Sequence, residues 1–230
     1  MTITVLRGEE ELTFDVTRKT IQVVVAQGQM LEDHIGLVTI ANFDERCAAE
    51  TIGAIESLVE QGAQALIFDV RFNPGGYKHE LVQILDYLLP KGVLFRSVYY
   101  TGEEDQDTSD DNCLDIPMAV LMNGSSYSAA EFFAAALEEY DWAVTVGEAT
   151  VGKSYFQNTL KLSDGSAVAL SVGKYCTPNG VSLQDEGGLV PGILVELTQE
   201  QLIALQSGEL APADDPQVQA AVEAVKKQLP

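Results

Sequence analysis

Cysteine and histidine are scarce in this 230-residue chain, and their scarcity excludes several kinds of site. The three cysteines, Cys47, Cys113 and Cys176, are odd in number and far apart, with no CxxC motif and no cysteine/histidine cluster. This spacing indicates neither a disulfide framework nor a metal centre. The two histidines, His34 and His79, also stand alone. We therefore expect neither a bound metal nor a cofactor.

Positive charge and long apolar runs are lacking as well. Lysine and arginine number 13 against 35 aspartates and glutamates, which gives a net charge of −22. Such a chain repels a phosphate backbone, so nucleic-acid binding is not expected. No stretch reaches the roughly 18 apolar residues of a membrane span, and the opening MTITVLRGEEEL lacks the pattern of a signal peptide. The chain is thus expected to be cytosolic, or to lack its targeting segment.

The most informative stretch runs from Asn123 to Gln157. Ser128 stands directly before Ala129–Tyr140, a run of good helix formers, so a helix is expected to begin at this serine. Twelve helical residues carry the chain roughly 18 Å away, and the β-rich run Ala143–Glu148 can return it by about 20 Å. Lys153 is therefore expected near the level of Ser128. This spacing permits a catalytic pair but occurs in many αβ units.

A second informative stretch, ALIFDVRFNPGG, covers residues 65–76. It reads as a buried strand followed by a turn at Asn73-Pro74-Gly75-Gly76, where backbone N–H groups can point outward. A helix is expected from about Lys78 to Leu89, so this turn could also cradle a phosphate. It lacks both a GxGxxG motif and a Walker lysine, which makes that interpretation weak.

The remaining pattern outlines the other elements. Alternation predicts two strands within residues 3–25, joined at Gly8, and a buried strand over 35–43 followed by a helix over 46–61. The acidic run 101–115 has no apolar period and is expected to be a solvated loop, since the pattern of a calcium loop is missing. Asp164-Gly165 signals a β-hairpin, and DDPQVQAAVEAVKKQLP predicts a closing helix.

Several of these segments resemble one family. MNGSSYSAAEFFAAAL and VGEATVGKSYFQ match, without a gap, the patterns V-N-x-x-S-A-S-A-S-E-I-x-A-x-A-L and V-x-G-E-x-T-x-G-K-x-x-x-Q of the C-terminal processing peptidases, the tail-specific serine proteases of family S41. The middle serine of the family's S-A-S-A-S falls on Ser128, its lysine on Lys153 and its glutamine on Gln157. The resemblance implies that these three residues are catalytic.

The same resemblance suggests further site residues. ALIFDVRFNPGG is similar to the family's L-D-L-R-x-N-x-G-G, whose glycine turn donates one amide to the oxyanion hole, the other coming from the residue after the nucleophile. The donors here would be Gly75 or Gly76, with Ala129. Glu131 and Thr150 also fall on residues that the family tends to keep, although a helix-capping carboxylate and a turn hydroxyl explain them nearly as well.

The resemblance spans almost the whole chain and implies its architecture. We expect an α/β fold, namely the ClpP/crotonase-like S41 protease core with a C-terminal β-hairpin region. Residues 1–20 resemble the last hairpin of a PDZ domain that is otherwise missing, and residues 21–230 would form the catalytic core; two ordinary core strands are the alternative for the first segment. The resemblance also implies a bacterial cell-envelope or secreted enzyme, acting on proteins or peptides with apolar C-termini.

The expected chemistry requires a base other than histidine. A serine hydroxyl needs a partner that removes its proton, and Lys153 is the residue placed to do so. A lysine with a pKa near the ordinary value of about 10.4 stays charged, but burial lowers that pKa, and TVGKSYF offers apolar neighbours. Gln157 lies an even number of residues further on, so on a strand it would share the face of Lys153 and could hold its amine.

Two other functions remain open at this stage. A crotonase-like acyl-CoA enzyme could use the Gly75-Gly76 turn as its oxyanion hole but would not need the Ser128/Lys153/Gln157 trio. A non-catalytic module could bind apolar ligands or peptides on the same fold, and the intact trio argues against it. The sequence leaves open both a monomer and a homo-oligomer, the natural substrate, and the activity of a chain without a complete PDZ domain.

Overall fold

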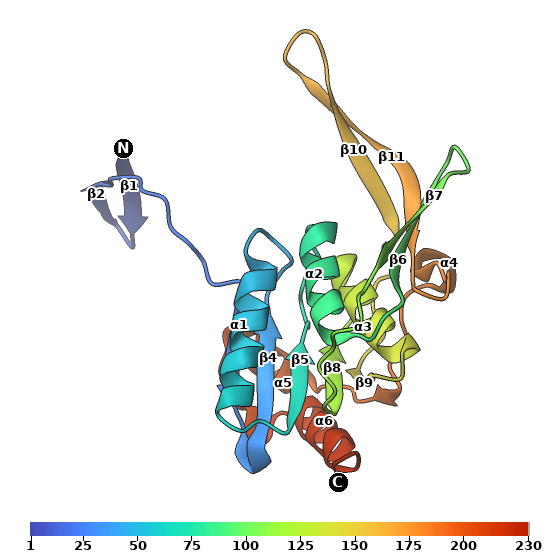
Figure 1. Cartoon of the computed structure of the whole chain (residues 1–230). Helices are drawn as coiled ribbons and strands as arrows, with labels where there is room; N and C mark the ends of the chain where they lie inside the picture. Colours follow the sequence, from blue (N-terminus) through green and yellow to red (C-terminus); the bar gives the residue numbers. More distant parts are fainter. Residues whose placement is uncertain (230) are drawn as a thin grey trace.

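A mainly parallel six-stranded sheet carries the core of the computed structural model, which describes residues 1–229 (Figure 1). Its strand order is β12-β9-β8-β5-β4-β3, and only β3 runs antiparallel to its neighbour. The strands are β3 (Ala26–Met30), β4 (Ile35–Ile40), β5 (Ala65–Asp69), β8 (Met118–Met122), β9 (Ala143–Gly147) and β12 (Ile193–Leu194).

Helices cover both faces of this sheet. On one face lie α1 (Cys47–Glu60), α2 (Lys78–Leu88) and α3 (Ala129–Glu139), and on the other lies α6 (Pro216–Lys226) (Figure 1). In β5, Leu66 and Phe68 point into the first layer while Ala65 and Ile67 point toward α6. Because both faces are buried, the central strands are continuous apolar runs rather than alternating ones. The predicted α/β core is confirmed.

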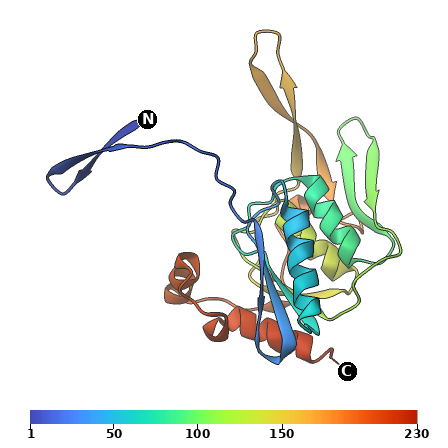
Figure 2. The same cartoon turned by 60° about the vertical axis from the view of Figure 1, so that its left-hand side comes forward.

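A second sheet of four antiparallel strands stands beside the first, in the order β10-β11-β6-β7. Its strands are β6 (Val93–Tyr99), β7 (Glu104–Thr108), β10 (Tyr155–Lys161) and β11 (Ala167–Cys176). The β10–β11 hairpin projects well beyond the core (Figures 1 and 2). Its tip turns where predicted, since the Asp164 carboxylate accepts hydrogen bonds from the N–H and hydroxyl of Ser166.

The N-terminal hairpin forms a separate two-stranded sheet, away from the core (Figure 2). It consists of β1 (Thr2–Arg7) and β2 (Glu10–Asp15), and residues 16–25 lead from it to β3 without regular structure. The expectation that the second strand continues toward Val25 was wrong. The register with β1 runs from Thr2↔Asp15 to Arg7↔Glu10, Val16 also bonds to Met1 through the backbone, and within residues 1–229 no strand pairing continues from there to Val25.

The acidic segment 101–115 differs from its expectation too, because β7 lies within it. This strand pairs with β6 from Val93↔Thr108 to Val98↔Glu104, although its side chains are mostly exposed. Strand β7 forms because it pairs with β6, and its own polar sequence does not indicate this pairing. Shorter elements complete the described chain: η1 (Glu32–His34), α4 (Leu183–Glu186), α5 (Gln199–Ser207) and η2 (Pro212–Asp214). No helix in residues 1–229 has the length and apolar character needed to cross a membrane.

Candidate active site

The predicted glycine turn and the predicted nucleophile meet where β5 and β8 end. These parallel neighbours bring their carboxyl ends to one edge of the sheet. A Cβ atom built on Gly75 would lie 2.8 Å from the Cβ of Ser128 and 2.9 Å from the backbone nitrogen of Ala129. One built on Gly76 would lie 2.4 Å from the carbonyl group of Phe43. Both glycines also have positive φ, 86° and 152°, so neither position accepts a side chain.

Ser128 has a strained backbone. It is the residue before α3, is half-buried, and has φ 59° and ψ −125°, a combination that costs a non-glycine residue about 1–3 kcal/mol. Hydrogen bonds on both sides hold it in place: its N–H donates to Glu131 at 2.8 Å, and the Tyr127 N–H donates to the carbonyl of Asn73 at 3.1 Å. Strained residues of this kind concentrate at functional sites, and here the strain falls on the predicted nucleophile.

The Glu131 carboxylate is fully buried and joins the two halves of the site. One oxygen, Oε2, accepts from the N–H of Ser128 at 2.8 Å and from the N–H of Lys153 at 2.9 Å. The other, Oε1, accepts from the Thr150 hydroxyl at 2.6 Å and from the Gly152 N–H at 2.5 Å. Because the N–H groups of Ser128 and Lys153 share one oxygen, the distance between their nitrogens cannot exceed the sum of the two hydrogen-bond lengths.

Lys153 is near Ser128 but does not have the burial that we expected. Its side chain is exposed, and its Nζ lies over the Tyr127 ring, 5.4 Å from the centroid. In the part of the chain that the structure describes, no hydrogen bond joins Nζ to the Ser128 Oγ. The lysine occupies the unpaired segment just before β10, where one side faces solvent. Catalytic hydrogen bonds are often absent or long before substrate binds.

Gln157 is not brought against Lys153. Its side-chain amide is exposed and donates to the Tyr155 carbonyl at 3.4 Å and to the Ser171 hydroxyl at 3.3 Å. The pairing of β10 with β11 shifts between Phe156 and Gln157, and the strand begins only at Tyr155. A simple count of alternating residues from Lys153 therefore does not give the position of this side chain.

Asn73 is a functional residue that the sequence pattern did not single out beyond its place in the turn. Its buried amide donates to the Ile40 carbonyl at 2.8 Å and accepts from the Gly75 N–H at 2.8 Å, while its own carbonyl accepts from Tyr127. It thereby links β4, the glycine turn and the segment before Ser128. An asparagine two residues before a glycine is the signal of such a side-chain turn.

The peptide between the two glycines has a defined direction. The Gly75 carbonyl accepts from the Phe43 N–H at 2.8 Å, and no peptide bond in residues 1–229 is cis. In a trans peptide the N–H points opposite to the carbonyl, so the Gly76 N–H points away from Phe43. Strand β5 lies between β4, which leads to Phe43, and β8, which leads to Ser128. The Gly76 N–H is thus directed toward the side of Ser128.

A buried ion cluster lies between the glycine turn and the C-terminal helix. The Arg71 guanidinium donates to Asp69 at 2.6 and 2.9 Å, to Asp215 at 2.7 Å and to Gln217 at 2.9 Å. Burial opposes the guanidinium charge, but the carboxylates of Asp69 and Asp215 outweigh it and raise the pKa of Arg71 above its ordinary value. The cluster anchors α6 to the segment that follows β5, through Arg71, which lies four residues before Gly75.

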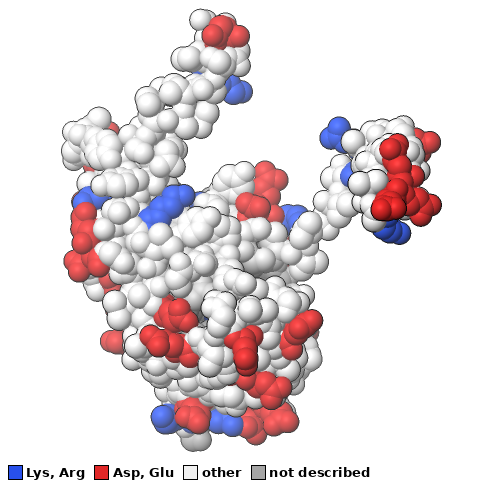
Figure 3. Space-filling view, turned by 180° about the vertical axis from the view of Figure 1, so that it is seen from behind, with Lys and Arg blue, Asp and Glu red and all other residues white. Residues whose placement is uncertain are grey.

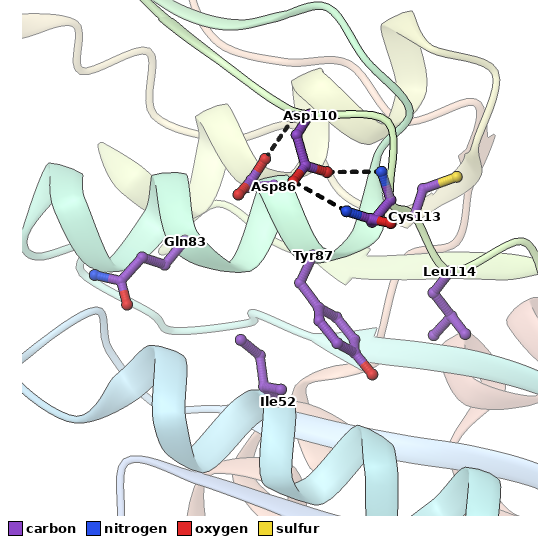
Figure 4. A pocket seen from close by; sticks show the side chains of 8 residues that line it. Ile52, Gln83, Asp86, Tyr87, Asp110, Cys113 and Leu114 are labelled. Atoms are coloured by element: carbon purple, nitrogen blue, oxygen red, sulfur yellow. Dashed lines mark hydrogen bonds between the residues drawn. The ribbon is translucent and has the colours of Figure 1, made fainter.

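A separate hollow of about 400 Å³ lies between α1, α2 and the segment after β7 (Figure 4). Figure 4 shows Asp86 and Asp110 at its rim, where the Asp86 carboxylate accepts from the Asp110 N–H at 2.9 Å, and Ile52 and Tyr87 deeper within it. None of the predicted catalytic or oxyanion residues lines this hollow. It therefore does not enter the chemistry described below.

The fold and the site together define a protein of the ClpP/crotonase-like α/β class, with a strained serine at a helix start facing a glycine turn. The family model "Peptidase family S41" matches residues 34–195, well over half of the chain. The chain belongs to this family.

Named relatives agree with this membership. The chain is 33% identical over 192 residues to carboxy-terminal processing protease CtpA of Bacillus subtilis, covering 83% of this chain and 41% of that protein. It is 31% identical over 215 residues to a carboxyl-terminal-processing protease of Synechocystis, covering 91% and 49%. The structure of a photosystem II D1 C-terminal processing protease superposes with a TM-score of 0.70 and 28% identity, over 81% of this chain and 52% of that one. The chain thus spans about half the length of these relatives.

Proposed function

We propose that this chain carries the catalytic core of a serine endopeptidase that cleaves protein or peptide substrates near apolar C-termini. Two observations support the proposal: the family membership, and the Glu131 carboxylate that fixes the backbones of Ser128 and Lys153 to one oxygen. The second observation carries it, because neither a ligand carrier nor an acyl-CoA enzyme needs a serine and a lysine held together in this way.

Ser128 is the nucleophile of the proposed reaction, and the side-chain amine of Lys153 is its base. Since the two backbones are already tied together, we expect the lysine side chain to turn away from the Tyr127 ring and bring Nζ to the hydroxyl when substrate binds. Lys153 takes the hydroxyl proton as Oγ attacks the substrate carbonyl, and returns it to the leaving amine as the peptide bond breaks. Water then hydrolyses the acyl-enzyme by the same route. Gln157 would orient the amine once the substrate covers it.

The tetrahedral oxyanion requires N–H donors that are free. The Gly75 N–H is held by Asn73, whereas the Gly76 N–H points toward the side of Ser128. The Ala129 N–H opens α3, where the first amides lack partners within the helix. We therefore assign the oxyanion hole to Gly76 and Ala129, with Gly75 as the close-packed residue between them. Each such donor contributes about 3 kcal/mol to catalysis.

The whole protein is proposed to include more than the core. Residues 1–20 would be the end of a PDZ domain that captures the substrate's C-terminus, residues 21–230 the catalytic core, and the site of action the cell envelope or exterior of a bacterium. We expect this chain to cleave folded proteins weakly and unstructured peptides better. Cleavage of a folded, tailed protein as fast as by a form with a complete PDZ domain would contradict this.

Two substitutions test the assignment of the base. Lys153→Ala should abolish peptide cleavage with an unchanged circular dichroism spectrum, whereas His79→Ala should have little effect. His79 is a suitable control because it is exposed, stacks on Tyr77 and lies 3.4 Å from the neighbouring Glu80 carboxylate. Activity that survives the loss of Lys153 and disappears with His79 would overturn the mechanism.

The exposed position of Lys153 favours one alternative, a module that binds peptides without cutting them. A fluorescent peptide distinguishes the two functions. A catalytic chain cleaves it and loses this ability in Ser128→Ala while still binding it. A binding module holds it intact in both forms.

A further inference from the structure

Strand β10 has one unpaired edge that begins beside the candidate active site. It is the first strand in the order β10-β11-β6-β7 and, within residues 1–229, pairs only with β11. Its first residue, Tyr155, follows Lys153 by two positions. A chain that pairs with this edge would therefore reach Lys153, whose backbone Glu131 ties to that of Ser128.

The register of the hairpin shows which groups face this edge. The Leu162 N–H donates to the Ser166 carbonyl at 2.8 Å, so these two residues form a hydrogen-bonded pair. In an antiparallel ladder such pairs alternate with pairs whose N–H and C=O point away from the partner strand. Asn158 is thus bonded to β11, while Thr159 and Lys161 direct their backbone N–H and C=O outward.

This edge carries little protection against strand addition, and its one charged residue, Lys161, lies at the end away from Lys153. Strand β10, YFQNTLK, contains no proline and no carboxylate, although the chain carries a net charge of −22. The opposite edge of the same sheet, β7, is EDQDT, with three carboxylates in five residues. Charged residues and proline are the usual protection of an exposed edge. On the face that Figure 3 shows, the charged side chains of the projecting hairpin gather near its tip.

We propose that an extended segment of the peptide substrate pairs with the free edge of β10 through main-chain hydrogen bonds. This proposal rests on the proposed peptidase function and adds a binding site to it. Main-chain pairing holds a substrate of almost any sequence, since every residue except proline supplies the same N–H and C=O groups. A peptide substrate is favoured over a second copy of this chain because the edge is continuous with the catalytic residues.

A pair of proline substitutions tests the pairing. Thr159→Pro removes an outward N–H from the β10 edge without removing a bond to β11. Ala169→Pro does the same on the other side of the hairpin. Ala169 is the cross-strand partner of Thr159, and it lies outside residues 172–176, through which β11 bonds to β6 and Tyr100. The binding of a fluorescent, unstructured peptide with an apolar C-terminus would be measured by anisotropy in a Ser128→Ala background, where no cleavage occurs.

Thr159→Pro should weaken binding about tenfold, the effect of one lost hydrogen bond, and Ala169→Pro less than twofold. Equal effects of the two substitutions, or none, would overturn the proposal. A second measurement leaves the hairpin unchanged, so a distorted hairpin cannot explain its result. Replacing successive substrate amides by esters should weaken binding at alternate positions, and equal weakening at every position would contradict pairing. A dimer that Thr159→Pro dissociates, with peptide binding unchanged, would assign the edge to a second copy instead.

A separate experiment tests the proposed peptidase chemistry independently of strand pairing. A small activated ester has no extended main chain to pair with β10, so its acylation of Ser128 tests the catalytic residues without strand pairing. Absence of acylation would refute the peptidase mechanism, whereas peptide binding in the Ser128→Ala background reports on the edge alone.

Discussion

Gly75 packs against Ser128 so closely that a Cβ atom on the glycine would lie 2.8 Å from the serine Cβ. Gly75→Ala must therefore displace the turn, the serine or both. We expect kcat/KM for a peptide to fall at least about 100-fold, because the neighbouring oxyanion donor loses its position, and the free energy of unfolding to fall by about 1–2 kcal/mol from the positive φ.

Gly53→Ala provides a matched control for this substitution. Gly53 lies on the exposed side of α1, and a Cβ atom there meets no atom within 4 Å. The change should stabilise the chain by about 0.5–1 kcal/mol and leave kcat/KM unchanged. Unfolding in urea and steady-state kinetics on both variants provide the comparison, and an active Gly75→Ala enzyme would contradict the proposed site.

Glu131→Gln tests whether Glu131 positions Ser128 and Lys153 for catalysis or only stabilises the fold. The amide offers one acceptor oxygen to the four donors that Glu131 now binds, so at least one N–H loses its partner, at a cost of about 1–3 kcal/mol. Because Ser128 and Lys153 share this carboxylate, acylation by the small ester should also slow at a temperature where the variant remains fully folded. Glu56→Gln, on the exposed face of α1, should change neither quantity. A folded Glu131→Gln variant with normal acylation would show that Glu131 acts only through stability.

Asp215 holds the end of β5 against the C-terminal helix. Asp215→Asn keeps an oxygen that can accept from the N–H groups of Gln217 and Val218 at the start of α6 but loses the ion pair with buried Arg71. Breaking a buried pair typically costs about 3 kcal/mol or more. We expect this loss in urea unfolding, with about 1 kcal/mol more for Asp215→Ala, which also removes the helix cap. Equal stability of Asp215→Asn and the native chain would be inconsistent with the ion cluster.

Sequence patterns predicted the sheet core and the four long helices, because these depend on apolar periodicity, whereas the meeting of Ser128 with the glycine turn was implied by the family resemblance. They did not predict the environment of Lys153, which depends on which segments cover residues before β10. Strand β7 was missed because its own polar sequence does not show that it pairs with β6. The position of the Gln157 side chain was missed because a shift in strand register cannot be read from residue spacing. The role of Asn73 was partly visible, since Asn-Pro-Gly indicates a turn but not its contacts with Ile40 and Tyr127.

The three thiols should differ sharply in reactivity. Burial raises the pKa of Cys47 to about 12, burial also raises the pKa of Cys176, and Cys113 is exposed. Since the thiolate is the reactive form, a disulfide reagent at pH 8 should react rapidly with one thiol in the native chain and with three after unfolding. Cys113→Ser should remove the rapid reaction, and rapid reaction that persists would show that a buried thiol becomes exposed.

Glu50 should make the attachment of the N-terminal linker depend on pH. Its carboxylate accepts from the Val25 N–H at 2.7 Å and the Ala26 N–H at 3.2 Å, and these bonds, that of Val25 above all, lower the pKa of Glu50. A carboxylate whose pKa is lowered by folding contributes stability. This stability is complete above the pKa of the unfolded chain, about 4.3, and is lost as the pH falls through the pKa of the folded chain. Hydrogen exchange at Val25 and Ala26, corrected for the intrinsic pH dependence of exchange, should therefore show less protection as the pH falls below about 4.3. In Glu50→Gln the amide oxygen can still accept but does not titrate, so the protection should be independent of pH, and protection that follows the native pH profile in this variant would exclude Glu50 as the cause.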